Sequence, residues 1–265
     1  MTSRRLANSR TGTADPAALE GIDSTALEGD QLAAGADAIA ALRPFGRAMP
    51  EARLVRPPQA GPPEAAALFE ALALAERGRR LEALQALDQA IAAFPGQVEL
   101  RLAKADLLAA GGDLEEAIAA VSGAIGISPR PAPLLVRRGA LVAQLGDQRG
   151  AEQDYRDAIK RDASYWLAYR YLGASRLRTG GAREAETVLR EALSLAPQDP
   201  ELVLYLGEAL LVQGRHEEAR RALEEAVGLL PDDPRGYQLL GRLFDRLGLA
   251  EEARAMHRKS REAGA

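Results

Sequence analysis

The sequence predicts an all-α protein in which helix-turn-helix hairpins of about 34 residues stack in chain order. Two ladders of residues indicate this fold: a glycine recurs every 34 residues where each hairpin turns, and a small residue recurs at the same interval where its helices cross. The turn glycines are Gly78, Gly112, Gly146, Gly180, Gly214 and Gly248. The small residues are Ala83, Ala117, Ala151, Ala185, Ala219 and Ala253. Each hairpin has an apolar face that only the next hairpin can bury, so the repeats predict one continuous array.

The array takes up residues 64–265 and divides into six units. Their predicted bounds are 64–97, 98–131, 132–165, 166–199, 200–233 and 234–265. In the first unit, the apolar spacing predicts helices over residues 64–76 and 80–93, the first of them started by Pro62 and Pro63. The turn glycines stand where the end of a helix favours a left-handed residue.

Helix ends and the end of the array have their own signals. Asp199 and Asp233 each precede a proline, which is typical of an N-cap carboxylate before a first helical turn. Asp113 and Glu116 have the spacing of a capping box. His257 occupies an apolar position of earlier units, and Arg261 another, as expected for the polar outer face of a terminal unit.

Residues 1–63 differ from the repeats, because they are rich in proline and glycine and carry seven arginines against seven acidic residues. We expect this extension to be largely disordered. Within it, residues 31–43 place Leu32, Ala36, Ile39 and Leu42 at helical spacing. Two interpretations are open: a transient helix in a tail, since short isolated helices are marginal, or a helix that docks on the array.

Composition excludes several classes of function. Hydrophobic residues make up 47% of the chain and aromatic residues 4%, so the core must be built mainly from Ala, Leu, Ile and Val. A net charge of −4 gives no strong attraction to nucleic acid or to an anionic membrane. No apolar run is long enough to span a membrane, and no apolar segment follows Arg4 and Arg5 to form a signal peptide. With no cysteines, a cytoplasmic protein is expected, and the abundance of Ala, Arg, Gly and Leu is typical of a bacterial one.

No catalytic, metal or cofactor motif is present in the sequence. His216 and His257 have no ligand partner at metal spacing, and adjacent acids such as Glu115 and Glu116 point about 100° apart on a helix. Walker, GxGxxG and GxSxG patterns are absent. The prediction is therefore a protein that is not an enzyme and binds no cofactor.

The repeats resemble the tetratricopeptide repeat family over residues 64–265. In the fourth unit the matching residues are Tyr169, Leu172, Gly173, Ala185, Leu189, Ala192 and Pro197. The first three units depart from this pattern, with Glu70, Lys104 and Arg138 where the family has leucine. The resemblance implies a right-handed α-solenoid whose first helices line a concave groove. It also implies a scaffold that holds another protein or a peptide.

Family geometry would place positions 2, 5, 9, 12 and 13 of each unit on the groove, with Tyr171 and Tyr205 beside them as ring anchors. The candidate binding residues are Leu68, Leu72, Leu102, Val136, Leu167, Arg170, Tyr171, Arg178, Leu204, Tyr205, Glu208, Gln238, Arg242 and Arg246. This set is apolar in the first three units and rich in arginine in the last three, which suits an amphipathic helix or an acidic extended segment. Alternatively, several of these residues only pack against neighbouring helices.

Three functional hypotheses follow. The leading one is a non-catalytic interaction scaffold for a protein or peptide, without nucleic-acid binding or membrane insertion. A second is self-occlusion, in which the helix at 31–43 occupies the groove until a partner displaces it. The third is an accessory arm of an enzyme or a multiprotein assembly.

Overall fold

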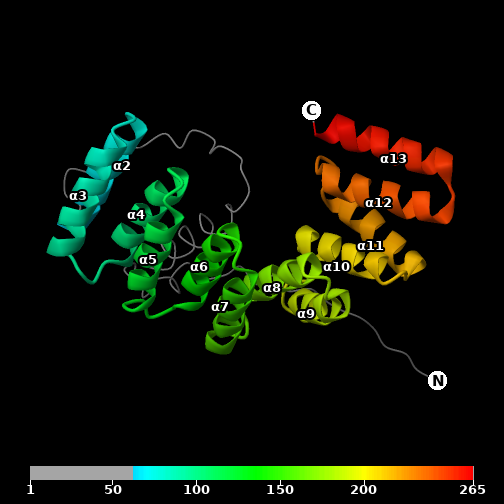
Figure 1. Ribbon diagram of the computed structural model, residues 1–265, viewed down its shortest axis with the longest axis horizontal. Helices are drawn as coiled ribbons and strands as arrows, with labels where there is room; N and C mark the ends of the chain where they lie inside the picture. The colour runs from blue at the N-terminus through cyan, green and yellow to red at the C-terminus, as the bar shows by residue number, and fades with distance from the viewer. Residues whose placement is uncertain (1–61, 265) are drawn as a thin grey trace, which may run out of the picture. The chain divides into compact units, whose positions relative to one another are not determined.

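The computed structural model describes residues 62–264, which form twelve α-helices and no strand. Figure 1 shows them as six successive pairs. The first helices of the pairs are α2 (Pro63–Glu76), α4 (Val98–Ala110), α6 (Ala132–Gln144), α8 (Trp166–Arg178), α10 (Pro200–Val212) and α12 (Pro234–Leu247). The second helices are α3 (Arg80–Ala93), α5 (Leu114–Ile125), α7 (Gln148–Arg161), α9 (Ala182–Leu195), α11 (His216–Leu229) and α13 (Ala250–Ala263). No helix in residues 62–264 is long and apolar enough to cross a membrane.

The turn glycines have the predicted conformation. All six have φ between 74° and 91°, a region that side-chain-bearing residues rarely adopt. At Gly214, the N–H donates to the carbonyl of Leu211 at 3.1 Å, and the N–H of Arg215 donates to the carbonyl of Leu210 at 3.0 Å. These two bonds form a Schellman motif, which satisfies the last carbonyls of α10 and starts α11 after a short turn.

Glycine is also required where the two helices of a hairpin cross. A methyl group on Gly173 would lie 2.7 Å from Leu189, and one on Gly207 would lie 2.6 Å from Leu223. Both leucines are fully buried, as is Ala185. The repeating small residues therefore set how closely the paired helices approach, as the sequence predicts.

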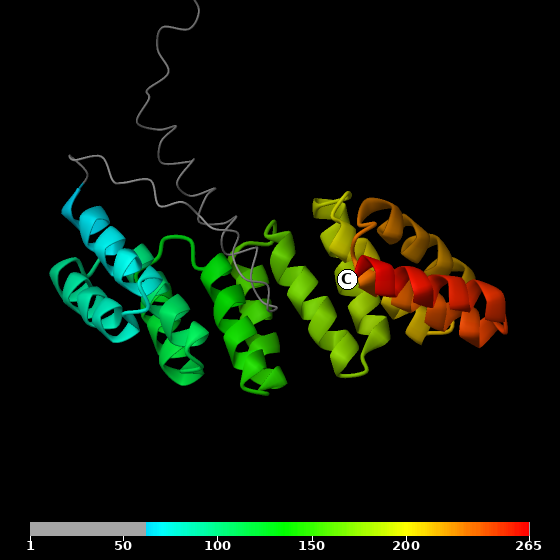
Figure 2. The same cartoon turned by 90° about the horizontal axis from the view of Figure 1, so that it is seen from above.

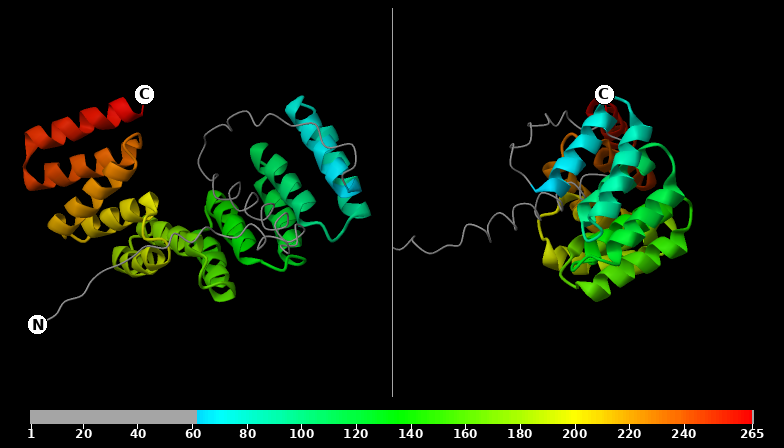
Figure 3. Two further views of the ribbon diagram at one scale, coloured as in Figure 1. Left: turned by 180° about the vertical axis from the view of Figure 1, so that it is seen from behind. Right: turned by 90° about the vertical axis from the view of Figure 1, so that its left-hand side faces the viewer.

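Each hairpin is closed by the first helix of the next unit. Leu202 and Ala209 on α10, for example, join one buried cluster with Ala185, Leu189 and Ala192 on α9. Figure 2 shows the hairpins following one another in chain order from α2 to α13. First helices of neighbouring units also pack against one another at four of the five joints. Second helices of neighbouring units make less contact with each other than the first helices do. The first helices thus form the inner side of the array, and Figure 3 shows the same hairpins from behind.

Two of the three predicted caps are confirmed. The Asp199 carboxylate accepts from the N–H of Leu202 at 2.9 Å, and Asp233 accepts from the N–H of Arg235 at 2.9 Å. The capping box at Asp113 is wrong, because this carboxylate accepts no backbone hydrogen bond at its helix. It is paired instead with the guanidinium of Arg80 from the preceding unit.

The C-terminal end of the array is polar, as predicted. His257 lies over Gly241 where other units have an apolar or aromatic side chain, and its Nε2 is 3.0 Å from Asp245. Arg261 is exposed. The helix predicted at 31–43, like the disorder predicted for the N-terminal extension, falls outside the described residues.

Candidate partner-binding surface

An ion-pair chain joins the first helices of the last three units. Arg170 on α8 donates to the carboxylate of Glu201 on α10. Arg235 on α12 donates to the other oxygen of Glu201 at 2.9 Å and to Asp233 at 2.7 Å. The Arg170 side chain is only 11% exposed, so its position is fixed by packing as well as by charge. One carboxylate therefore connects guanidinium groups of the preceding and the following units.

Aromatic rings flank the chain of ion pairs through Glu201. The guanidinium of Arg170 lies 5.3 Å from the ring centre of Trp166 and 5.4 Å from that of Tyr171. Arg235 lies 6.0 Å from the ring of Tyr205. Burial raises the pKa of both tyrosines, and nearby arginines only partly offset it, so both rings are neutral at pH 7. Stacked cations and rings of this kind hold each other in place and offer flat apolar surface.

Three polar side chains of the predicted set are left without a partner beside this chain. Among the described residues, no hydrogen bond or ion pair engages Glu208, Arg178 or Arg242. Glu208 is half-buried, and desolvation raises the pKa of its carboxyl, while the charges of Arg242 and Arg235 act in the opposite direction. A half-buried carboxylate with no donor gains free energy when a bound molecule supplies one.

The structure divides the other predicted residues between surface and core. Val136, Leu167 and Leu204 are buried, with 5%, 6% and 3% of their surface exposed. They pack between helices and present no surface to a partner. Leu68, Leu72 and Leu102 are partly buried, while Gln238 and Arg246 are exposed. The Arg246 guanidinium donates to the carbonyl of Leu211 at 2.9 Å, which ties α12 to α10.

Sequence reasoning pointed to the aromatic region around Trp166 but missed Glu201 and Arg235 as parts of this surface. Spacing was the available signal, since Glu201 lies 31 residues after Arg170 and 34 residues before Arg235. A separation of about one repeat brings residues together on neighbouring first helices. Opposite charges at that separation therefore predict ion pairs between units.

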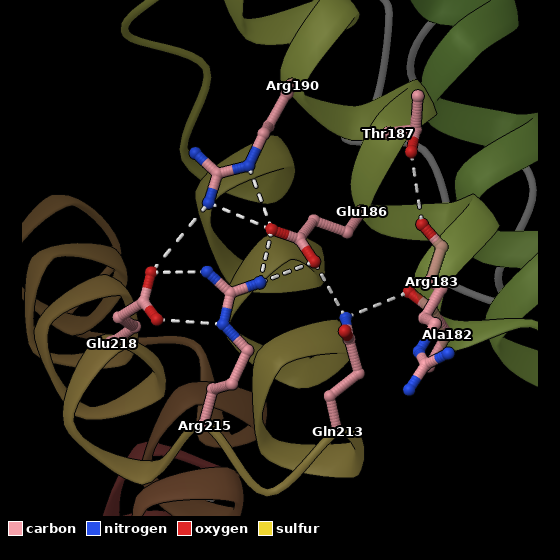
Figure 4. Close-up of polar contacts among 8 residues, drawn as sticks. All are labelled: Ala182, Arg183, Glu186, Thr187, Arg190, Gln213, Arg215 and Glu218. Atoms are coloured by element: carbon pink, nitrogen blue, oxygen red, sulfur yellow. Dashed lines mark hydrogen bonds and ion pairs between the residues drawn. The ribbon is translucent and has the colours of Figure 1, made fainter.

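A second polar cluster is centred on Glu186 of α9 (Figure 4). Glu186 accepts from Gln213 at 2.9 Å, from Arg215 at 2.6 and 2.7 Å, and from Arg190 at 3.0 Å. Burial favours the neutral acid, but these hydrogen bonds outweigh it and hold the pKa of Glu186 below its usual value. An open depression of about 690 Å³ lies beside the cluster. Since the Glu186 carboxylate is satisfied from both sides of the α9–α10 joint, the cluster fastens two units together.

The described residues hold no group of three or more His, Asp or Glu side chains arranged to bind a metal ion. His257 is paired with Asp245, and His216 stands at the start of α11. The arrangement offers hydrogen bonds, charge and apolar surface to a bound molecule.

Together, these features define an array of stacked helical hairpins whose first helices are joined by ion pairs and cation–π contacts. Tetratricopeptide repeat models match residues 68–130, 137–200 and 176–243. The chain belongs to the tetratricopeptide repeat family. Repeat arrays of this family are protein-interaction scaffolds, generally without catalytic activity of their own.

Solved structures share the fold. A tetratricopeptide repeat protein from Parabacteroides merdae is 18% identical with a TM-score of 0.63, over 73% of this chain and 77% of that one. MamA from Desulfovibrio magneticus is 23% identical with a TM-score of 0.56, over 63% and 94%. YrrB, described as having an unusual peptide-binding site, is 19% identical with a TM-score of 0.53, over 68% and 93%. The predicted right-handed α-solenoid is thus confirmed. No curated protein matches the chain.

Proposed function

We propose that this chain is a non-catalytic scaffold that holds a segment of a partner protein against α8, α10 and α12. The observation that carries the proposal is a set of charged groups, Glu208, Arg178 and Arg242, for which the described residues provide no hydrogen bond or ion pair, beside rings that stack on ion-paired arginines. Rings held in place lose little entropy on binding, and unpaired charges gain partners, so both favour association over the free state.

The charges indicate what the segment carries. Arg178 and Arg242 are exposed and cationic, so acidic side chains of the partner would pair with them. Glu208, between them along the array, would accept a hydrogen bond from a partner N–H group or basic side chain. Apolar side chains would lie on Tyr171 and Tyr205. A segment with all three features is a peptide, and the mixture of charges does not form the continuous basic stripe that nucleic acid requires.

Affinity purification of the full chain followed by mass spectrometry would identify candidate partners, and calorimetry with a synthetic partner segment would then measure affinity. We expect Arg242→Gln and Arg178→Gln each to weaken binding about tenfold, the value of one charge-assisted contact. Arg221→Gln is the matched control, because Arg221 is exposed on the second helix α11 with no ion pair among the described residues. Equal effects at all three positions would refute binding at this surface.

Two finer versions of this function lead to different measurements. If residues 31–43 are themselves a ligand of the groove, deletion of residues 1–60 raises partner affinity. If the chain is an accessory arm of an enzyme or an assembly, the purification returns one enzyme or complex in constant stoichiometry. A broad set of partners that share a sequence motif favours a general adaptor.

A further inference from the structure

The face with which one unit meets the next carries three arginines in the last unit. On a second helix, the fifth, ninth and twelfth residues lie on one side, at i, i+4 and i+7. In α13, the last helix in Figure 1, these residues are Arg254, Arg258 and Arg261, and all three are exposed. Within residues 62–264, no hydrogen bond or ion pair engages their guanidinium groups. We call these three residues the arginine row.

The earlier joints show what packs on this face. The twelfth residue of a second helix meets the third residue of the following first helix, since a methyl group on Gly236 of α12 would lie 2.7 Å from Val227 of α11. The ninth residue meets the seventh, since Asp88 of α3 forms an ion pair with Lys104 of α4.

The fifth residue completes the match. Glu152 of α7 lies 3.1 Å from Arg176, the eleventh residue of α8. Residue numbers thus fall on one helix as they rise on the other, so the two helices run antiparallel. The incoming helix uses its third, seventh and eleventh residues, which share one side at i, i+4 and i+8.

The arginine row reverses the charge of these joints. At three of the five joints, a carboxylate at the fifth or ninth residue of the second helix pairs with a base of the following unit; the pairs are Asp88 with Lys104, Glu152 with Arg176, and Glu186 with Arg215. The side of α13 that corresponds to these carboxylates is cationic. A helix that occupied the same place on α13 would therefore match it with acidic residues.

The arginine row is also unfavourable for α13 by itself, because like charges at i, i+4 destabilise a helix. On α11 the fifth residue is Arg220, but the ninth is Glu224, and the two pair at 2.8 Å. On α13 the ninth residue is Arg258, and none of the glutamates of this helix forms an ion pair among the described residues. A polar end face requires only hydrated side chains, whereas three like charges in a row add repulsion that an anionic partner would relieve.

We infer that the arginine row is a docking surface for an acidic α-helix of a partner protein. This helix lies antiparallel to α13, with carboxylates at i, i+4 and i+8 opposite Arg261, Arg258 and Arg254. Guanidinium groups bind carboxylates through paired hydrogen bonds, and the methylene stems of the arginines supply apolar contact. The surface is on a second helix, so it is separate from the proposed binding surface on α8, α10 and α12, and the inference does not depend on the proposed function.

Two labelled synthetic helical peptides of equal composition test the inference, with affinity for the full chain measured by fluorescence anisotropy. One peptide carries three glutamates at i, i+4 and i+8, and the other carries them at i, i+5 and i+10, where they point to different sides. Each exposed charge pair contributes about two- to fivefold, so the first peptide should bind about tenfold more tightly or better.

The variants assign the binding to the row. Replacing Arg254, Arg258 and Arg261 together by glutamine should reduce the affinity of the first peptide to that of the second. The matched control replaces Arg149, Arg183 and Arg221 by glutamine, because these residues are exposed on earlier second helices and have no ion pair among the described residues. This control loses the same charge and should keep the affinity within about twofold, and circular dichroism would confirm that both variants are folded.

A charge exchange tests the register. Arg258→Glu should weaken binding of the first peptide, and a peptide with lysine at the central position should restore it, because this gives the polarity of Asp88 and Lys104. Failure of the lysine peptide to restore binding overturns the proposed register.

Other outcomes overturn the inference as a whole. Equal affinities for the two peptides, or equal losses in the two triple variants, mean that only net charge is recognised. Tighter binding of single-stranded RNA or of phosphatidylserine vesicles through the same arginines assigns the row to nucleic acid or to a membrane. A concentration-dependent dimer that is lost with the three arginines assigns it to a second copy of the chain.

Discussion

The crossing glycines allow packing to be separated from helix propensity. In Gly207→Ala the new methyl group would lie 2.6 Å from Cδ2 of Leu223 and 2.7 Å from its Cγ. Leu223 is fully buried, so it cannot turn away without moving its neighbours. Overpacking of this kind costs about 1–3 kcal/mol. The gain in helix propensity from glycine to alanine is about 1 kcal/mol, which leaves the variant between unchanged and about 2 kcal/mol less stable.

Gly241→Ala is the matched comparison in the last unit. Its methyl group would lie 2.5 Å from Cε1 of His257, which is closer still. The His257 side chain, however, is 42% exposed and can rotate into solvent, giving up a contact with Asp245 that is worth about 0–1 kcal/mol. The propensity gain is the same in both variants and cancels in their difference. We therefore expect Gly241→Ala to be more stable than Gly207→Ala by about 1–3 kcal/mol.

Urea unfolding followed by circular dichroism would measure both variants. Because a repeat array can unfold in parts, hydrogen exchange of α10 to α13 would show which unit is affected. Equal stabilities, or a larger loss at Gly241, would refute the argument that burial of the opposing side chain decides the cost.

Two further variants test the turns and the joint between units. Gly214→Ala places a side chain at φ 76° and should lower the free energy of unfolding by about 1–2 kcal/mol, which a lower urea midpoint would show. Gly228→Ala is the control: Gly228 has ordinary helical geometry and nothing within 4 Å of the new methyl group, so this variant should not lose stability. Glu186→Gln should cost about 1–3 kcal/mol at pH 7, because it weakens charge-assisted bonds from Arg215 and Arg190. Since the pKa of Glu186 is lowered on folding, its stabilisation is complete above the unfolded value of about 4.3 and is lost as pH falls through the folded one. The difference in unfolding free energy between wild type and Glu186→Gln should therefore shrink between pH 5 and pH 3, and a constant difference would contradict the role of charge.

Features that repeat were predictable because each is a local requirement. Gly214 must adopt a left-handed conformation whatever surrounds it, and Asp199 caps its helix through a backbone N–H only three residues away. The predicted helices of the first unit agree with α2 and α3 to within one residue for the same reason.

Features that depend on contacts between units were less predictable. Asp113 has the spacing of a capping box, yet the Arg80 guanidinium from the preceding hairpin takes its carboxylate. Leu167 and Leu204 occupy expected groove positions but are buried, and Leu204 joins a cluster with Leu239 and Leu240 of the next unit. Glu201 was not singled out at all, since its role exists only when α8 and α12 stand on either side of it.

The chain by itself determined the period, the turns and the stacking order, because a glycine with positive φ and a small residue at a helix crossing are required one hairpin at a time. Only the tertiary structure decided which polar side chains find partners. Pairing between units depends on distances between helices that the spacing of residues does not specify. That is why the ion-pair chain through Glu201, and the unpaired groups beside it, became visible only in the folded array.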